Sequence, residues 1–225
     1  FDVKKSWEVM LDGQAAAVAI PRGVFSIWTG SAEFGPLMAY VEAAAGSADP
    51  LILAGFDSQF TGAHSEMYLR SELLAFLTAH DSAVMGGEGW GTFMELLGTL
   101  VGDGWYSVKP AAADKDVFDS VLQALRAEAA GFEDDEEVRF WIQMLESTAA
   151  NAEVNYLYDP NSFSFALSSI RDRQMGSNLA WLAGEGFPQE KIIVWAATLH
   201  IARDVQEIEV LNTTSGFYAE YTTMG

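Results

Sequence analysis

The chain lacks cysteine entirely, and it has only three histidines among its 225 residues. The absence of cysteine excludes a disulfide framework, a zinc–thiolate site, an iron–sulfur cluster and thiol catalysis. It leaves the compartment open, since cytoplasmic proteins and proteins secreted after processing can both lack cysteine. Few side chains can therefore exchange a proton near neutral pH, and His64, His80 and His200 are the first to consider.

Positive charge is also scarce. Lys and Arg number 12 against 32 Asp and Glu, which gives a formal net charge of -20. Such a surface repels phosphate groups, so we expect neither nucleic acid nor an anionic membrane as a partner. No apolar run approaches the roughly 18 residues of a membrane span, and no signal peptide is visible, so we expect a soluble protein. The oligomeric state stays open.

Hydrophobic residues make up 50% of the chain, enough to build a core. Two short apolar runs, Leu51–Phe56 and Ile192–Ala196, are typical of buried parallel strands. Most of the sequence between them has helical periodicity. We therefore predict a single helix-rich α/β domain over 1–225, with a central, mostly parallel sheet flanked by helices and a large helical insertion at about 62–188.

The helical predictions rest on apolar residues spaced by three and four. This spacing occurs in 69–77, in 117–125 after a possible N-cap at Asp114, and in 138–145. The acidic run Glu133–Glu137 suits the start of the last of these helices, because a helix dipole favours negative charge there. A further helix is expected over Phe163–Leu182 and ends near Gly184 and Gly186.

Polar residues follow both predicted strands. Asp57 and Gln59 come after the first strand, and His200 comes after the second. Reactive groups gather past the carboxyl ends of parallel strands, so we expect Asp57 and His200 to share a pocket, with Asp57 orienting the imidazole or polarising a nucleophile. The alternatives are a histidine satisfied by a backbone carbonyl and an aspartate that caps a turn.

The predicted helix after Phe163 adds Arg171 and its neighbour Asp172 to these candidates. Arg171, Met175 and Asn178 share one face of it, and the arginine could bind a carboxylate or stabilise an oxyanion. The alternative is an ion pair. The chain has neither a Gly-x-Ser-x-Gly elbow nor a His-Glu-x-x-His motif, so a serine hydrolase of the usual type and a zincin find no support.

Three motifs in this order resemble the erythromycin esterase-like family, some of whose members carry a label from succinoglycan biosynthesis. They are Gly55–Gln59, the run from Arg171 through Asn178, and Val194–His200. The closing Thr222–Gly225 is similar to a family segment as well. The resemblance extends from about Trp28 to the end of the chain. It implies an α/β fold and hydrolysis of an ester, such as a macrolide lactone, by a water activated without a metal or cofactor. A histidine would be the general base, helped by carboxylates and an arginine.

Two departures from the family pattern matter. Ala197 and Thr198 stand where the family usually has histidine and asparagine, and the N-terminal Gly-Glu-x-x-His-Gly motif has no counterpart, so we expect a portion upstream of this chain or loss of the reaction. One hypothesis is therefore a hydrolase acting on a small-molecule ester. In it His200, Arg171 and Asp57 are catalytic, and Gln59, His64, Asn178 and Trp195 bind substrate. The other is an inactive protein that holds an apolar ligand on the same scaffold, against Trp195, Phe56 and Trp181.

Overall fold

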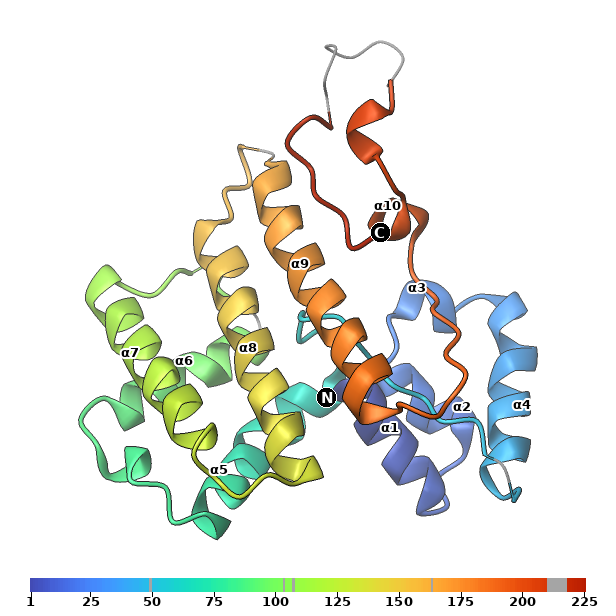
Figure 1. Cartoon of the computed structure of the whole chain (residues 1–225), viewed down its shortest axis with the longest axis horizontal. Helices are drawn as coiled ribbons and strands as arrows, with labels where there is room; N and C mark the ends of the chain where they lie inside the picture. The colour runs from blue at the N-terminus through green and yellow to red at the C-terminus, as the bar shows by residue number, and fades with distance from the viewer. Residues whose placement is uncertain (49, 103, 107, 163, 210–217) are drawn as a thin grey trace. The chain divides into compact units, whose positions relative to one another are not determined.

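The computed structural model describes residues 1–48, 50–102, 104–106, 108–162, 164–209 and 218–225. Two compact units divide the described chain. The first comprises Phe1–Gly55 and Phe60–Asp103, and the second comprises Phe56–Gln59 and Gly104–Gly225. Both are built from helices (Figure 1).

The predicted central sheet is wrong. Within the described residues there is no β-strand, and the isolated bridge between Asp159 and Ser162 belongs to a turn. Both predicted strands, Leu51–Phe56 and Ile192–Ala196, run without regular secondary structure. The second run is also not buried, since the exposed fraction of Ile193 is 90%. Strand hydrogen bonds join one segment to another, so an apolar run becomes a strand only where a partner backbone lies beside it.

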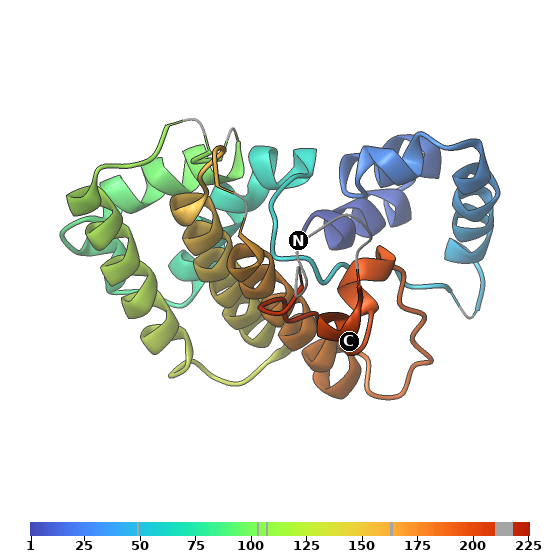
Figure 2. The same ribbon diagram turned by 90° about the horizontal axis from the view of Figure 1, so that it is seen from above.

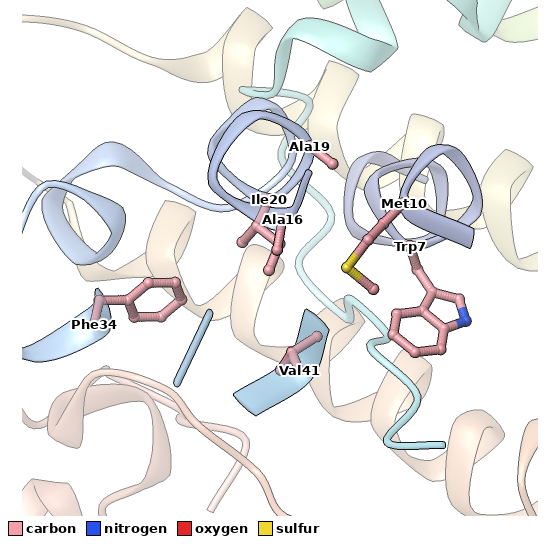
Figure 3. Packing of buried hydrophobic residues seen from close by; sticks show 7 residues of the cluster. All are labelled: Trp7, Met10, Ala16, Ala19, Ile20, Phe34 and Val41. Atoms are coloured by element: carbon pink, nitrogen blue, oxygen red, sulfur yellow. The ribbon is translucent and has the colours of Figure 1, made fainter. Parts of the chain in front are cut away.

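The first helices of the first unit enclose a small apolar core. They are α1 (Asp2–Leu11), α2 (Ala16–Ala19), the 3₁₀ helix η1 (Ile20–Arg22), α3 (Ser26–Thr29), the 3₁₀ helix η2 (Ala32–Phe34) and α4 (Gly35–Ala45). Figure 3 shows Trp7 and Met10 of α1 on one side of this core, and Ile20 and Val41 within it. The spacing of three between Trp7 and Met10 places both on one face of α1, which is why that face is buried.

The rest of the first unit begins with a π-helical turn, η3 (Ser65–Leu69), which continues into α5 (Arg70–Ala79). The 3₁₀ helix η4 (Val84–Gly86) and α6 (Trp90–Val101) follow. The predicted apolar face of 69–77 is confirmed, because Leu69, Leu73, Phe76 and Leu77 are all buried.

Three long helices form the body of the second unit: α7 (Ala112–Ala129), α8 (Glu136–Leu157) and α9 (Phe165–Trp181), with α8 between the other two (Figure 1). The acidic run is confirmed as a helix start. The carboxylate of Asp135 caps α8 by accepting a hydrogen bond from the amide of Val138 at 2.8 Å. By contrast, α7 begins at Ala112, ahead of the N-cap predicted at Asp114.

Helix α9 confirms the predicted helix after Phe163, although Phe163 itself lies outside the described residues. It continues into a π-helical turn, η5 (Leu182–Gly186), which contains both predicted terminating glycines. An irregular segment then leads to α10 (Thr198–Ile201) and the 3₁₀ helix η6 (Val205–Glu207). Figures 1 and 2 show the C-terminal residues beside α10.

The part of α9 that the fold buries is mostly polar. Its buried residues are Ser169, Asp172, Met175 and Asn178. Buried polar side chains on a helix need hydrogen-bond partners, so their partners reveal what the helix organises.

None of the helices in the described ranges is both long enough and apolar enough to span a bilayer.

Candidate functional site

Helix α10 presents His200 to the middle of α9. The imidazole Nδ1 lies 2.7 Å from Oδ1 of Asp172, whose side chain is fully buried, while the His200 side chain is 19% exposed. An ionised carboxylate only accepts hydrogen bonds, so Nδ1 carries the hydrogen and donates it. The lone pair of the neutral ring is then at Nε2. This tautomer is the one that a general base acting through Nε2 requires.

The second oxygen of Asp172 is held by a different side chain. The hydroxyl of Tyr221 donates a hydrogen bond to Oδ2 at 2.9 Å and lies 3.5 Å from Nδ1 of His200. Burial, followed by the hydrogen bond and charge of Asp172, raises the pKa of the Tyr221 phenol, so it stays a protonated donor. Each oxygen of the buried carboxylate thus has its own donor.

Arg171, the neighbour of Asp172 in the chain, pairs with Asp57. Its Nε donates to Oδ1 of Asp57 at 2.9 Å, and its Nη2 donates to Oδ2. Burial disfavours the charged guanidinium, but the hydrogen bonds and charge of Asp57 outweigh it and raise the pKa of Arg171. The same Asp57 Oδ1 accepts the backbone amide of Gln59 at 3.1 Å, which closes a tight turn. The two structural alternatives are therefore both present: Arg171 forms an ion pair, and Asp57 caps a turn.

Asn178 fastens the segment Phe56–Gln59 to the helices. Its Nδ2 donates to the carbonyl oxygen of Phe56 at 3.0 Å and to Oγ of Ser147 on α8 at 2.9 Å. Its Oδ1 accepts a hydrogen bond from Gln174 at 2.9 Å. Both ends of the amide are thus engaged within the protein, and a contact between Asn178 and substrate stays a prediction.

Helix α9 therefore gathers the predicted catalytic residues, although in a different arrangement from the one expected. Consecutive helical side chains diverge by about 100°, so Arg171 and Asp172 reach different neighbours. Asp172, rather than Asp57, is the carboxylate bonded to His200. Trp195 lies on the irregular segment ahead of α10 with 51% of its surface exposed.

Sequence reasoning missed two members of this site. It noted Asp172 only beside Arg171 and did not connect it with His200, and it did not consider Tyr221. A signal was present for each. Asp172 is an acid in the middle of a predicted helix, and Tyr221 directly precedes the Thr222–Gly225 motif.

His64, a predicted substrate-binding residue, lies in the first unit and is 1% exposed. Among the described residues neither of its ring nitrogens has a hydrogen-bond partner. Burial lowers the pKa of His64, so the ring is held neutral. The adjacent Ser65 is tied by its backbone amide to the carboxylate of Asp2 at 2.7 Å. A role for His64 in binding substrate stays a prediction.

The described parts of both units contain no group of three or more His, Asp or Glu side chains arranged to hold a metal ion.

Comparison with known proteins agrees with the motifs. A family model described as erythromycin esterase matches residues 4–218. No curated protein and no solved structure gives a significant match. Because the family model covers nearly all of the sequence, the chain belongs to the erythromycin esterase family, and this membership supports a hydrolase-type function.

Proposed function

We propose that this protein hydrolyses a carboxylic ester or lactone by attack of a water molecule, with His200 as the general base. The observation that carries the proposal is the bond from the imidazole Nδ1 to the buried carboxylate of Asp172. That bond selects the tautomer with a lone pair at Nε2, and the negative carboxylate stabilises the imidazolium that forms when the base takes up a proton.

In the proposed reaction Nε2 of His200 removes a proton from water as the oxygen adds to the carbonyl carbon of the ester. The π electrons of the carbonyl move to its oxygen and give a tetrahedral oxyanion. When this intermediate collapses, the bond to the alkoxy oxygen breaks, and the imidazolium returns its proton to the leaving alkoxide. The products are a carboxylic acid and an alcohol, and no metal or cofactor takes part.

Arg171 is the candidate for holding the developing negative charge. Asp57 engages its Nε and Nη2, which leaves Nη1 outside that ion pair. The raised pKa keeps the guanidinium charged. Asp57 would then act on substrate through Arg171, by fixing the plane in which the remaining N–H groups point. Gln59, whose backbone joins the same turn, and the exposed indole of Trp195 are the proposed substrate contacts.

The test compares His200→Gln with His80→Gln, each in the purified protein, on p-nitrophenyl esters and on a macrolide lactone. His80 is a matched control, because its Nδ1 lies 2.9 Å from the carbonyl oxygen of Phe76 at the end of α5 and it has no proposed role. His200→Gln should lower kcat/KM about 10²- to 10⁴-fold, the range for a general base, while His80→Gln leaves it within threefold. Hydrolysis that survives His200→Gln unchanged would remove the proposed base.

A second candidate function is the binding of an apolar ligand without turnover. The observation that favours it is the irregular segment ahead of α10, where Ile192, Ile193, Val194 and Trp195 are all exposed. Exposed apolar side chains in a run are unusual away from a binding surface. Quenching of tryptophan fluorescence by a macrolide lactone, lost in Trp195→Ala, together with no hydrolysis by the wild-type protein, would favour this function over the esterase.

A further inference from the structure

We propose that Tyr221 is a positioning residue for the base: its hydroxyl holds the Asp172 carboxylate in the orientation in which Oδ1 accepts the hydrogen bond from Nδ1 of His200. The inference rests on the proposed function, because it assigns Tyr221 a place in the same site.

The carboxylate of Asp172 is fully buried, and two protein groups donate hydrogen bonds to it. His200 engages Oδ1 and Tyr221 engages Oδ2, at 2.7 and 2.9 Å. If the phenol donor were removed, Oδ2 would be a buried oxygen without this partner. The carboxylate could then turn about its Cβ–Cγ bond, and the direction of the acceptor facing Nδ1 would no longer be set.

Contacts of its ring and of the neighbouring backbone hold Tyr221 in place beside α9. It stacks on Phe165 at the start of α9, with the ring centroids 5.2 Å apart. The amide of Thr222, the next residue, donates to Oγ of Ser169 at 2.9 Å, one turn before Asp172. Gln206 donates to the carbonyl oxygen of Tyr221 at 2.6 Å. These contacts fix where the hydroxyl lies, as a positioning role requires.

The same C-terminal segment also holds the backbone around His200. The amide of Met224 donates to the carbonyl oxygen of His200 at 3.1 Å, and Oγ1 of Thr223 donates to the carbonyl oxygen of Ala202 at 2.6 Å. The Tyr221–Met224 segment therefore contacts both partners of the His200–Asp172 pair. A displacement of this segment would disturb the carboxylate and the imidazole together.

The experiment compares Tyr221→Phe with Tyr156→Phe by kinetics and by ¹⁵N NMR of the histidine rings. Phe keeps the ring that stacks on Phe165 and removes only the hydroxyl. Tyr156 is a matched control on α8, where its ring faces the ammonium groups of Lys109 and Lys115. For Tyr221→Phe we expect kcat to fall roughly 10- to 100-fold, the size seen when metal-bound histidines lose an outer hydrogen-bond partner, with KM within twofold. We also expect a weaker hydrogen bond from His200 to Asp172, seen as a lower-frequency Nδ1 proton resonance that exchanges faster with solvent. Tyr156→Phe should change neither.

The NMR readout does not depend on turnover, so the two proposals can fail separately. If the wild-type protein hydrolyses no ester, the proposed function fails, while the comparison of the Nδ1 proton of His200 still decides the role of Tyr221. If the resonance and exchange rate of the Nδ1 proton of His200 are the same in Tyr221→Phe as in wild type and kcat is unchanged, the positioning role is overturned. The wild-type spectrum is a second test that needs no variant. A mixture of tautomers already present there would also overturn it.

Discussion

Replacing Asp172 with asparagine separates the charge of the residue from its size and tests the proposed base directly. In the wild-type protein the carboxylate of Asp172 accepts two hydrogen bonds, one from Nδ1 of His200 and one from Tyr221. A carboxamide has one accepting end and one donating end, so it cannot accept both. Either the amide oxygen faces Tyr221 and the NH₂ group faces His200, or the reverse.

The energies of the two orientations decide the outcome. With NH₂ toward His200, the imidazole flips to the Nε2–H tautomer, both hydrogen bonds survive, and Nε2 has no lone pair. With NH₂ toward Tyr221, the phenol loses its acceptor, and a buried unsatisfied donor costs about 1–3 kcal/mol. The wrong tautomer should therefore dominate by about 5- to 150-fold, at roughly 1.4 kcal/mol per factor of ten.

Loss of the negative charge adds to this effect, because the imidazolium formed during water attack no longer has an anionic partner. Together we expect Asp172→Asn to lower kcat/KM about 10²- to 10⁴-fold, or about 3–5 kcal/mol of transition-state stabilisation. Initial rates on a p-nitrophenyl ester measure this, and a thermal unfolding curve shows whether the variant is folded. Asp119→Asn, on the exposed face of α7 beside Lys115, is the control for the same chemical change. A folded Asp172→Asn variant with a rate within threefold of wild type would refute the reasoning.

Three further predictions concern stability. Burial lowers the pKa of His64, so the unfolded chain binds the histidine proton more tightly than the folded chain does. The free energy of unfolding should therefore be full above about pH 6.5 and fall as the pH drops below that value. Urea titrations from pH 4 to 8 should show a smaller fall in His64→Gln. Gly104 has a φ of 69°, and a Cβ there would lie 2.8 Å from Oδ1 of Asn155, so Gly104→Ala should cost about 1–3 kcal/mol in a urea titration; no loss would show that the backbone adapts. The partly exposed ion pair between Arg126 and Glu146 joins α7 to α8, so Glu146→Gln should cost less than about 1 kcal/mol by the same measurement, and a larger loss would contradict its exposure.

The helices of the second unit were largely predictable, because helical hydrogen bonds are local and the burial of one face leaves a period in the sequence. Val138, Trp141 and Leu145 are buried as their spacing predicts, and the acidic residues before them start α8. Helix α7 begins about one turn earlier than predicted. No side chain caps its first turn, and a capping side chain is what usually marks a helix start in a sequence.

The strands were predicted wrongly for the opposite reason. Ile192–Ala196 has the composition of a buried strand, yet it is irregular and largely exposed. A strand is stabilised by a neighbouring backbone, and composition does not reveal whether one is present. The expectation that a sheet edge would collect the site residues was wrong as well, because Arg171 and Asp172 of α9 contact Asp57 and His200 instead.

The sequence by itself determined the helix-rich character of the chain, its acidic balance and the motifs that mark the family. It also singled out His200, Arg171 and Asp57. Only the tertiary structure decided that Asp57 pairs with Arg171 while Asp172 and Tyr221 serve His200. The physical reason is that a hydrogen bond needs its donor and acceptor within a few ångströms and in the right direction. Which distant residues meet a side chain of α9 is set by how the helices and the C-terminal segment pack.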